Sequence, residues 1–283
     1  MTDGKHRIEG FEDRELAWGG VGLRYAVGGD GPPLVLVHGL GGTIENWRAL
    51  APELATRHLV VVLDLPGHGR SPRLAGRAAL DDFAEAALAV AAEESAVPAV
   101  WIGHSLGGLV ALRAAALQPE AVRGLVLAAA AGPSATSWSA QATLTALGLV
   151  KPGKLIAPFR ESWARSRIGR RAAFGWWGVA DPDAFEPDLA EAFLVGPAYH
   201  ADTGQAGRAL VGSDPRAELD RVACPALLLW GATDNWVPLA DGMEYARRLR
   251  APLRTIAGCG HLLIGERPDA CLAAIGEFLA SLD

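Results

Sequence analysis

The stretch at residues 100–112, Val-Trp-Ile-Gly-His-Ser-Leu-Gly-Gly-Leu-Val-Ala-Leu, constrains the fold of this chain more than any other. An apolar run stops at Gly103, and an Ala- and Leu-rich helical pattern begins at Leu106. Between them stands Gly-x-Ser-x-Gly, which is typical of a sharp strand-to-helix turn with an exposed serine at its apex. Such a turn brings main-chain segments together on either side of the serine, where a Cβ atom would collide. We therefore expect a buried strand, a strained turn at Ser105, and a helix that begins directly after it.

The rest of the chain alternates strand and helix patterns at a regular spacing. Residues 14–31 predict two short strands joined by glycines, which form an antiparallel edge. Alternating strands and helices favour a mostly parallel central sheet with helices on both faces, which is an α/β fold. We expect further strands at 34–37, 58–64, 100–103, 124–130, 225–231 and 253–256, and helices at 45–55, at 81–94 with Asp81 as the cap, from 106, at 239–249 and at 268–282.

This alternation breaks at Gly132-Pro133 and resumes only after Leu219. The segment between them contains scattered prolines and no buried-strand run. We expect one α/β domain, with its core at 1–132 and 220–283 and a helical lid at 133–219 inserted over the carboxyl edge of the sheet. Because aromatic side chains often line small-molecule pockets, at least one of the lid's tryptophans should face the cavity above Ser105. The candidates are Trp138, Trp163, Trp176 and Trp177.

Composition excludes several other classes of protein. The chain has 26 basic and 32 acidic residues and a net charge of −6, which gives no electrostatic case for nucleic acid. No window approaches the roughly 18 apolar residues of a membrane span, and the first residues lack the apolar core of a signal peptide. Three widely spaced cysteines (Cys224, Cys259, Cys271) indicate reduced thiols and a cytoplasmic protein. No histidine or cysteine pair has metal-ligand spacing, and the glycine-rich loops lack the phosphate-binding pattern, so we expect no metal and no cofactor.

Two later loops supply partners for the serine. Asp234 follows the strand at 225–231, and His261 follows the strand at 253–256, so both lie at the carboxyl edge where Ser105 lies. A serine hydroxyl needs a base, and the base needs an orienting acid. His200 is a rival base but lies inside the lid with no strand before it, and the side chain of His104 must point away from its neighbour. We therefore predict a triad of Ser105, His261 as the base and Asp234 as the acid.

The loop His38-Gly-Leu-Gly41 provides the second wall of the predicted site. The backbone N–H groups of Leu40 and Leu106 could converge on a developing negative charge, as an oxyanion hole requires. Gly41 lets the loop pass close to the serine, and we expect His38 to fix the loop by hydrogen bonding.

These motifs together resemble those of the α/β-hydrolase fold family, in its small, lidded, single-domain form. The resemblance covers nearly the whole chain except residues 133–219, and it implies a serine hydrolase similar to carboxylesterases. The motifs that carry it are His38-Gly-Leu-Gly, Asp64-Leu-Pro-Gly-His-Gly-Arg-Ser71, Gly103-His-Ser-Leu-Gly-Gly108, Gly231-Ala-Thr-Asp234 and Gly258-Cys-Gly-His261.

Departures from the family's branches narrow the expected reaction. Relatives that act on haloalkanes or epoxides have Asp at the position of Ser105, and relatives with the acid one strand earlier would need a carboxylate near 130–132, where there is none. Prolyl aminopeptidases usually have Trp at the position of Leu106. Meta-cleavage carbon–carbon hydrolases usually have Asn, Pro and Trp where this chain has His104, Gly42-Thr43 and Leu262.

The resemblance thus implies hydrolysis of a small-molecule carboxylic ester, thioester or lactone through an acyl-enzyme. Two alternatives stay open. One is a carbon–carbon hydrolase of the meta-cleavage type, whose acidic substrate the lid's arginines would bind. The other is a catalytically idle receptor or scaffold on the same fold. The acyl group, the alcohol and a homo-oligomeric state also stay open.

Overall fold

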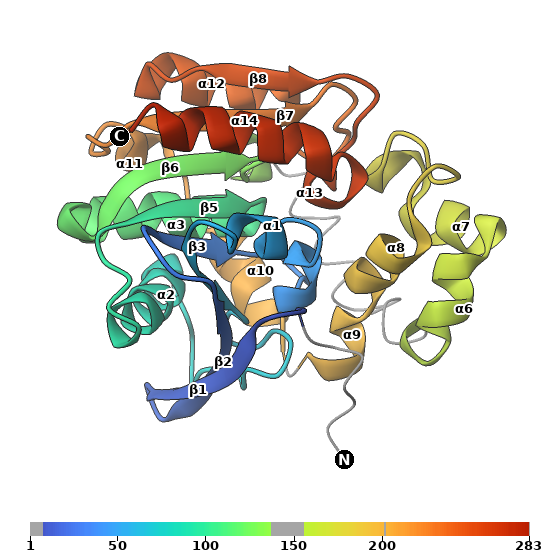
Figure 1. Ribbon diagram of the computed structural model, residues 1–283, viewed down its shortest axis with the longest axis horizontal. Helices are drawn as coiled ribbons and strands as arrows, with labels where there is room; N and C mark the ends of the chain where they lie inside the picture. The colour runs from blue at the N-terminus through green and yellow to red at the C-terminus, as the bar shows by residue number, and fades with distance from the viewer. Residues whose placement is uncertain (1–7, 137–155, 201, 283) are drawn as a thin grey trace.

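The computed structural model describes residues 8–136, 156–200 and 202–282, and its centre is a single twisted sheet (Figure 1). Eight strands of the described residues form this sheet in the order β1-β2-β4-β3-β5-β6-β7-β8. β1 and β2 form an antiparallel edge, β2 also pairs antiparallel with β4, and all the remaining pairs are parallel. The strands are β1 (Glu12–Trp18), β2 (Val21–Gly28), β3 (Pro33–Val37), β4 (Leu59–Leu63), β5 (Ala99–His104), β6 (Val122–Ala128), β7 (Ala226–Gly231) and β8 (Leu253–Ile256).

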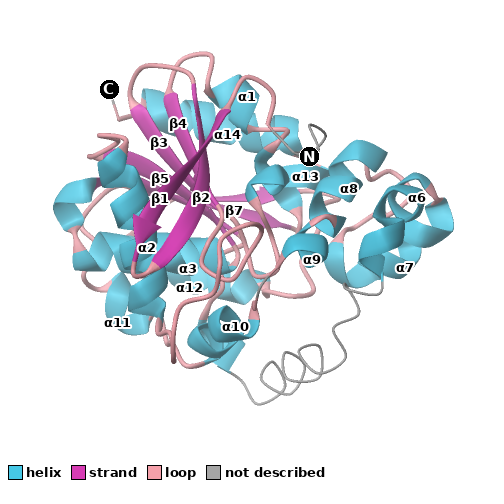
Figure 2. Cartoon of the chain, turned by 90° about the horizontal axis from the view of Figure 1, so that it is seen from below, coloured by secondary structure: helices cyan, strands magenta, loops and turns pink. Residues whose placement is uncertain are grey.

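Helices cover both faces of the sheet, as the alternating pattern predicts (Figure 2). One face carries α1 (Ala51–Leu54) and α14 (Pro268–Ala280). The other carries α2 (Leu80–Glu93), α3 (Leu106–Leu117), α11 (Arg216–Leu219) and α12 (Leu239–Leu249). The core between these layers includes the fully buried rings of Trp47, Trp101, Trp230, Tyr245 and Phe83. The α/β architecture inferred from the sequence is therefore confirmed.

The described residues between β6 and β7 contain helices and no strand. A short turn, η4 (Ala157–Phe159), leads into α6 (Arg160–Arg165), α7 (Arg167–Gly178), α8 (Pro187–Leu194) and α9 (Gly196–Tyr199). These helices lie beyond the carboxyl ends of the parallel strands (Figure 1). α10 (Gly204–Val211) contacts α2 instead, and its Ala206 and Leu210 belong to the core of the sheet. The division into core and lid stays a prediction, and the packing of α10 on the core favours an insertion that ends before Gly204.

Two local expectations were wrong. The helix expected at 45–55 is a short 3-10 turn, η1 (Ile44–Trp47), followed by the separate α1, because the ring of Pro52 cannot follow a continuous helix without clashing with the carbonyl of Arg48. Asp81 does not cap α2. The neighbouring Asp82 does, since its carboxylate accepts the N–H of Ala79 at 2.7 Å.

Nothing among the described helices combines the length and the apolar character that crossing a bilayer would require.

Candidate active site

The turn after β5 holds Ser105 in strained backbone geometry. Its φ is 53° and its ψ is −118°, a conformation that costs a non-glycine residue about 1–3 kcal/mol. The main chain on both sides enforces it. The N–H of Ser105 donates to Ala128 O at 3.0 Å, and its carbonyl accepts from the amides of Gly108 and Ala131 at 3.0 and 2.9 Å. The conformation of Ser105 is therefore fixed jointly by the end of β5, the start of α3 and the segment at the end of β6.

The glycines of this turn are required by close approach. A Cβ atom at Gly103 would lie 2.3 Å from Gly107 O, and one at Gly107 would lie 2.0 Å from Val37 O. Real Cβ atoms do not come this near to main-chain oxygens. The Gly-x-Ser-x-Gly pattern thus has the steric cause that the sequence indicated.

Ser105, His261 and Asp234 form one hydrogen-bonded chain at the carboxyl edge of the sheet. The distance from Ser105 Oγ to His261 Nε2 is 3.1 Å, and that from His261 Nδ1 to Asp234 Oδ2 is 2.9 Å. The Asp234 side chain is fully buried. Its Oδ1 accepts the backbone amides of Trp236 and Val237 at 2.8 and 2.9 Å, which satisfies the second oxygen. Because the imidazole donates its Nδ1–H to the carboxylate, its Nε2 carries no proton and can accept the hydroxyl hydrogen, as a general base must.

His104 holds the base rather than competing with it. Its Nε2–H donates to the backbone carbonyl of His261 at 2.9 Å, and the two rings lie 5.0 Å apart. Burial lowers the pKa of His104 to about 3, so its imidazole is neutral.

Glu266, in the short helix α13 (Leu263–Glu266), holds the base loop from the other side. Its two carboxylate oxygens accept the amides of Gly260 and Ala180 at 2.5 and 2.6 Å. The amide of Leu262 donates to Gly178 O at 3.1 Å, next to the same insertion segment. Glu266 could not be singled out from the sequence. Its only signal is that a carboxylate follows the apolar run at 262–264, which predicts a buried partner but does not identify it.

The loop at 38–42 is fixed from behind by His38, as predicted. His38 Nδ1 donates to Gly39 O at 2.8 Å, and its Nε2 accepts the amide of Leu65 at 3.1 Å. Gly39 O also accepts the amide of Gly42 at 3.0 Å. Because Gly39 O and the N–H of Leu40 belong to one planar peptide, these bonds also fix the direction of that N–H.

The loop and the serine are in close contact. A Cβ atom at Gly39 would lie 3.0 Å from the Cβ of Ser105. Within the described residues, the amides of Leu40 and Leu106 donate to no protein acceptor. Leu106 is the first residue of α3, where amides have no acceptor inside the helix. The loop and the start of α3 thus each offer one N–H donor, from Leu40 and Leu106, beside the serine.

A buried charged network supports this loop. Arg24 contacts the carboxylates of Asp13, Glu45 and Asp64 at 2.9, 3.3 and 3.2 Å. Asp64 also accepts the backbone amides of Ile44 and Arg70, each at 2.9 Å. Burial and the nearby Glu45 raise the pKa of Asp64 to about 6. Asp64 of the Asp-Leu-Pro-Gly motif thus joins the main chain at residue 44 to that at residue 70.

Three buried histidines make stability depend on pH. Burial lowers the pKa of His38 and His104 to about 3, and that of His68 well below its ordinary value of about 6.5. Below pH 6.5 the unfolded chain binds protons that the folded chain excludes, so the free energy of unfolding falls as pH drops from 6.5 toward 3. Each histidine contributes about 1.4 kcal/mol per pH unit in that window. Asp64, with its raised pKa, acts in the opposite sense.

Urea denaturation between pH 7 and 5 measures this slope, and His68→Asn isolates one contribution. The Asn amide can replace His68 Nδ1 as donor to Pro66 O. We expect the slope of unfolding free energy against pH to decrease by about 1.4 kcal/mol per unit in the variant. Identical slopes would contradict the assignment of a neutral, buried His68.

Of the four tryptophans predicted for the pocket, Trp163 makes no described contact with Ser105. Trp138 lies outside the described residues, and Trp163 is half-buried on α6. Trp176 and Trp177 lie on α7. Their role in substrate binding stays a prediction. A fifth tryptophan, Trp236, stacks on the ring of His261 with centroids 6.0 Å apart and is 45% exposed. Trp236 follows the predicted acid by two positions, but no sequence pattern singles it out.

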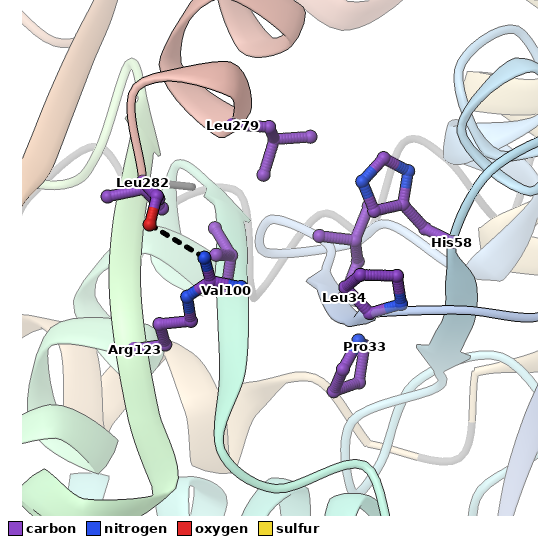
Figure 3. Close-up of a pocket in the computed structure, with 8 residues that line it drawn as sticks. Pro33, Leu34, His58, Val100, Arg123, Leu279 and Leu282 are labelled. Carbon is purple, nitrogen blue, oxygen red and sulfur yellow. Dashed lines mark hydrogen bonds between the residues drawn. The ribbon is translucent and has the colours of Figure 1, made fainter.

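Two hollows lie on opposite sides of the molecule. A groove of about 370 Å³ lies in the insertion and is lined by Ala157, Pro158, Arg160, Pro197, Ala198 and His200. Its size falls in the range of small-molecule sites. The other, at the amino ends of β3, β5 and β6, has room for about one water molecule, with a volume of about 20 Å³. There Arg123 donates to Leu282 O at 2.8 Å (Figure 3), and the hollow is a packing gap.

Metal-ligating side chains do not gather in the described part of the chain: no three His, Cys, Asp or Glu are arranged to hold an ion. All three cysteines are free thiols.

Comparison with known proteins gives the family and the fold of the chain. A family model described as alpha/beta hydrolase fold matches residues 32–268. The pimeloyl-[acyl-carrier protein] methyl ester esterase of Edwardsiella ictaluri (strain 93-146) is 31% identical over 251 residues, which are 87% of this chain and 92% of that protein. The dihydrolipoyllysine-residue acetyltransferase component of the acetoin cleaving system of Pseudomonas putida is 42% identical over 131 residues. That match spans 46% of this chain and about a third (35%) of the longer relative. The crystal structure of ALR0039 from Nostoc sp. PCC 7120 is similar with a TM-score of 0.75 and 27% identity, over 96% of this chain and 99% of that chain.

Proposed function

Because this chain belongs to the α/β-hydrolase fold family, we propose that it hydrolyses a carboxylic ester through an acyl-enzyme on Ser105. One observation carries the proposal: a serine in a strained turn is hydrogen-bonded to a histidine whose other nitrogen contacts a buried carboxylate. This arrangement activates a hydroxyl for attack on a carbonyl. The pimeloyl-[acyl-carrier protein] methyl ester esterase is similar to this chain over most of both proteins. This similarity supports ester hydrolysis over the other reactions of the family.

The proposed reaction has two halves. His261 takes the Oγ proton of Ser105 as the hydroxyl oxygen attacks the ester carbon, and the carbonyl oxygen becomes an oxyanion. The N–H groups of Leu40 and Leu106 are the donors for this charge. When the intermediate collapses, His261 gives its proton to the departing alcohol. Water then attacks the acyl-enzyme by the same steps, which releases the acid and restores the serine.

The groove lined by Arg160 and His200 is our candidate for the part of the substrate remote from the ester. Most of its lining is apolar, with a charged side chain at one position, as sites for small organic molecules often are. The exposed ring of Trp236 offers a second apolar contact beside the base.

A panel of esters and an active-site probe test the proposal. Purified protein should hydrolyse p-nitrophenyl and methyl esters with saturation kinetics, show a burst of p-nitrophenol equal to the enzyme concentration when deacylation is slow, and react with a fluorophosphonate at Ser105. An idle scaffold would give neither turnover nor labelling. A carbon–carbon hydrolase would prefer a dienoic or a diketone acid to every ester by at least tenfold in kcat/KM.

A further inference from the structure

We propose that His200 of the insertion is a positioning residue for the oxyanion loop, so that the insertion takes part in transition-state stabilisation. The inference rests on the proposed function, because it concerns the N–H of Leu40 as a donor to the oxyanion. It goes beyond the expectation that the insertion serves only to select substrates.

His200 joins two core loops through both ring nitrogens. Nδ1 accepts the amide of Gly69 at 2.9 Å, and Nε2 lies 2.8 Å from Gly41 O. An amide can only donate, so Nδ1 carries no proton, and Nε2–H must donate to the carbonyl. A single neutral tautomer therefore satisfies both contacts. The ring is half-buried at the end of α9.

The bond to Gly41 completes the fixation of the loop. On the amino-terminal side of Leu40, Gly39 O is held by His38 and Gly42. On its carboxyl-terminal side, Gly41 has a φ of 74°, and its carbonyl is held by His200. The Leu40 amide lies between two anchored carbonyls. Gly41 O shares a planar peptide with the N–H of Gly42, which donates to Gly39 O at 3.0 Å, so His200 adds a second bond to that peptide. The added bond matters because the glycines at 41 and 42 have few steric limits of their own.

The insertion is shaped for this contact. A Cβ atom at Gly196 would lie 2.6 Å from Gly41 O and 2.6 Å from the Nε2 of His200. A second bond follows the same route, since Asn46 Nδ2 donates to Ala192 O at 2.9 Å while its Oδ1 accepts the amide of Thr43 at 3.1 Å. Two separate bonds thus connect the insertion to the segment at 38–47.

His200 also lines the groove proposed for the substrate. A ligand seated there contacts the side chain that holds Gly41 O. Through His200, the insertion therefore links the part of the substrate remote from the ester to the Leu40 N–H that stabilises the oxyanion. Binding energy from that remote part can then lower the energy of the transition state.

Three variants test this role. His200→Phe keeps an aromatic ring and removes both hydrogen bonds, whereas His200→Gln can restore the donor to Gly41 O. Gln205→Met is the matched control, because Gln205 fastens the insertion elsewhere, to Leu74 O and Gly76 O at 3.0 and 2.8 Å. Deleting an oxyanion donor costs about 10²–10³ in kcat, so displacing one should cost about 10–100-fold.

For His200→Phe we expect that loss in kcat, and an equal loss of affinity for a trifluoromethyl ketone, which forms an oxyanion adduct with the serine. His200→Gln should recover most of both, and Gln205→Met should change neither. Wild-type kcat in His200→Phe, or an equal loss in Gln205→Met, would overturn the proposal.

Amide hydrogen exchange at 38–43 gives a readout that needs no turnover. Exchange should rise at least tenfold in His200→Phe and stay at the wild-type rate in Gln205→Met, and unchanged exchange in both would overturn the proposal. If wild-type protein neither hydrolyses esters nor labels at Ser105, the proposed function fails, and this experiment still decides whether His200 holds the loop.

Discussion

Ser105→Ala is expected to leave a folded protein whose ester turnover is lower by roughly 10⁴–10⁶-fold. The hydroxyl supplies the oxygen that forms the acyl-enzyme, and alanine has no such oxygen. Folding should survive because the side chain makes one hydrogen bond, to His261, while the turn is held by main-chain bonds that alanine keeps. The measurement is kcat on p-nitrophenyl esters beside the melting temperature and fluorophosphonate labelling.

Ser162→Ala is the matched control, because Ser162 is an exposed serine on α6. It should keep wild-type turnover and labelling. If Ser105→Ala retained more than about a thousandth of wild-type turnover, or if the probe reacted with another serine, Ser105 would not be the nucleophile.

Asp234→Asn should lower kcat by about 10⁴-fold with little change in KM. The surroundings dictate how the asparagine must sit. The Oδ1 position accepts two backbone amides, from Trp236 and Val237, so the oxygen of Asn must stay there and its NH₂ must face His261 Nδ1. A donor at that place forces the histidine into the tautomer whose Nε2 carries the proton. Such a histidine cannot accept the proton of the serine.

Asp241→Asn provides the control for a rival acid. The Asp241 carboxylate lies against Gly132, just beyond β6, where some relatives place the triad acid, and a Cβ atom at Gly132 would lie 2.5 Å from its Oδ2. It accepts the hydroxyl and the amide of Ser134. Its replacement should change kcat by less than about threefold. A large loss in Asp241→Asn together with a mild one in Asp234→Asn would reverse the two assignments.

The sequence predicts the parts of this molecule that depend on neighbours along the chain. The turn at Ser105 follows from glycines two residues away, and the strands follow from short apolar runs. The order of the loops at 105, 234 and 261 then follows from the parallel sheet, since every strand ends at the same edge. Even the helix at 239–249 and the strand at 253–256 have the predicted bounds.

Contacts between distant segments could not be predicted in this way. His200 and Gly41 are 159 positions apart, and Glu266 and Ala180 are 86 apart. Nothing in a local pattern states which main-chain amide a buried carboxylate or imidazole will meet. A histidine far from a strand end, such as His200, suggests no role beyond that of a rival base until its two partners are known.

The order of the loops along the chain has a consequence for synthesis. The serine turn is complete within α3, but its base is 156 positions further on, after the whole insertion. At about 5–20 residues per second, a ribosome needs roughly 8–30 s to cover that distance. During that interval the nascent chain carries its serine without a base. A polypeptide released early is therefore expected to be chemically inert, and esterase activity in a cell would report only chains translated past His261.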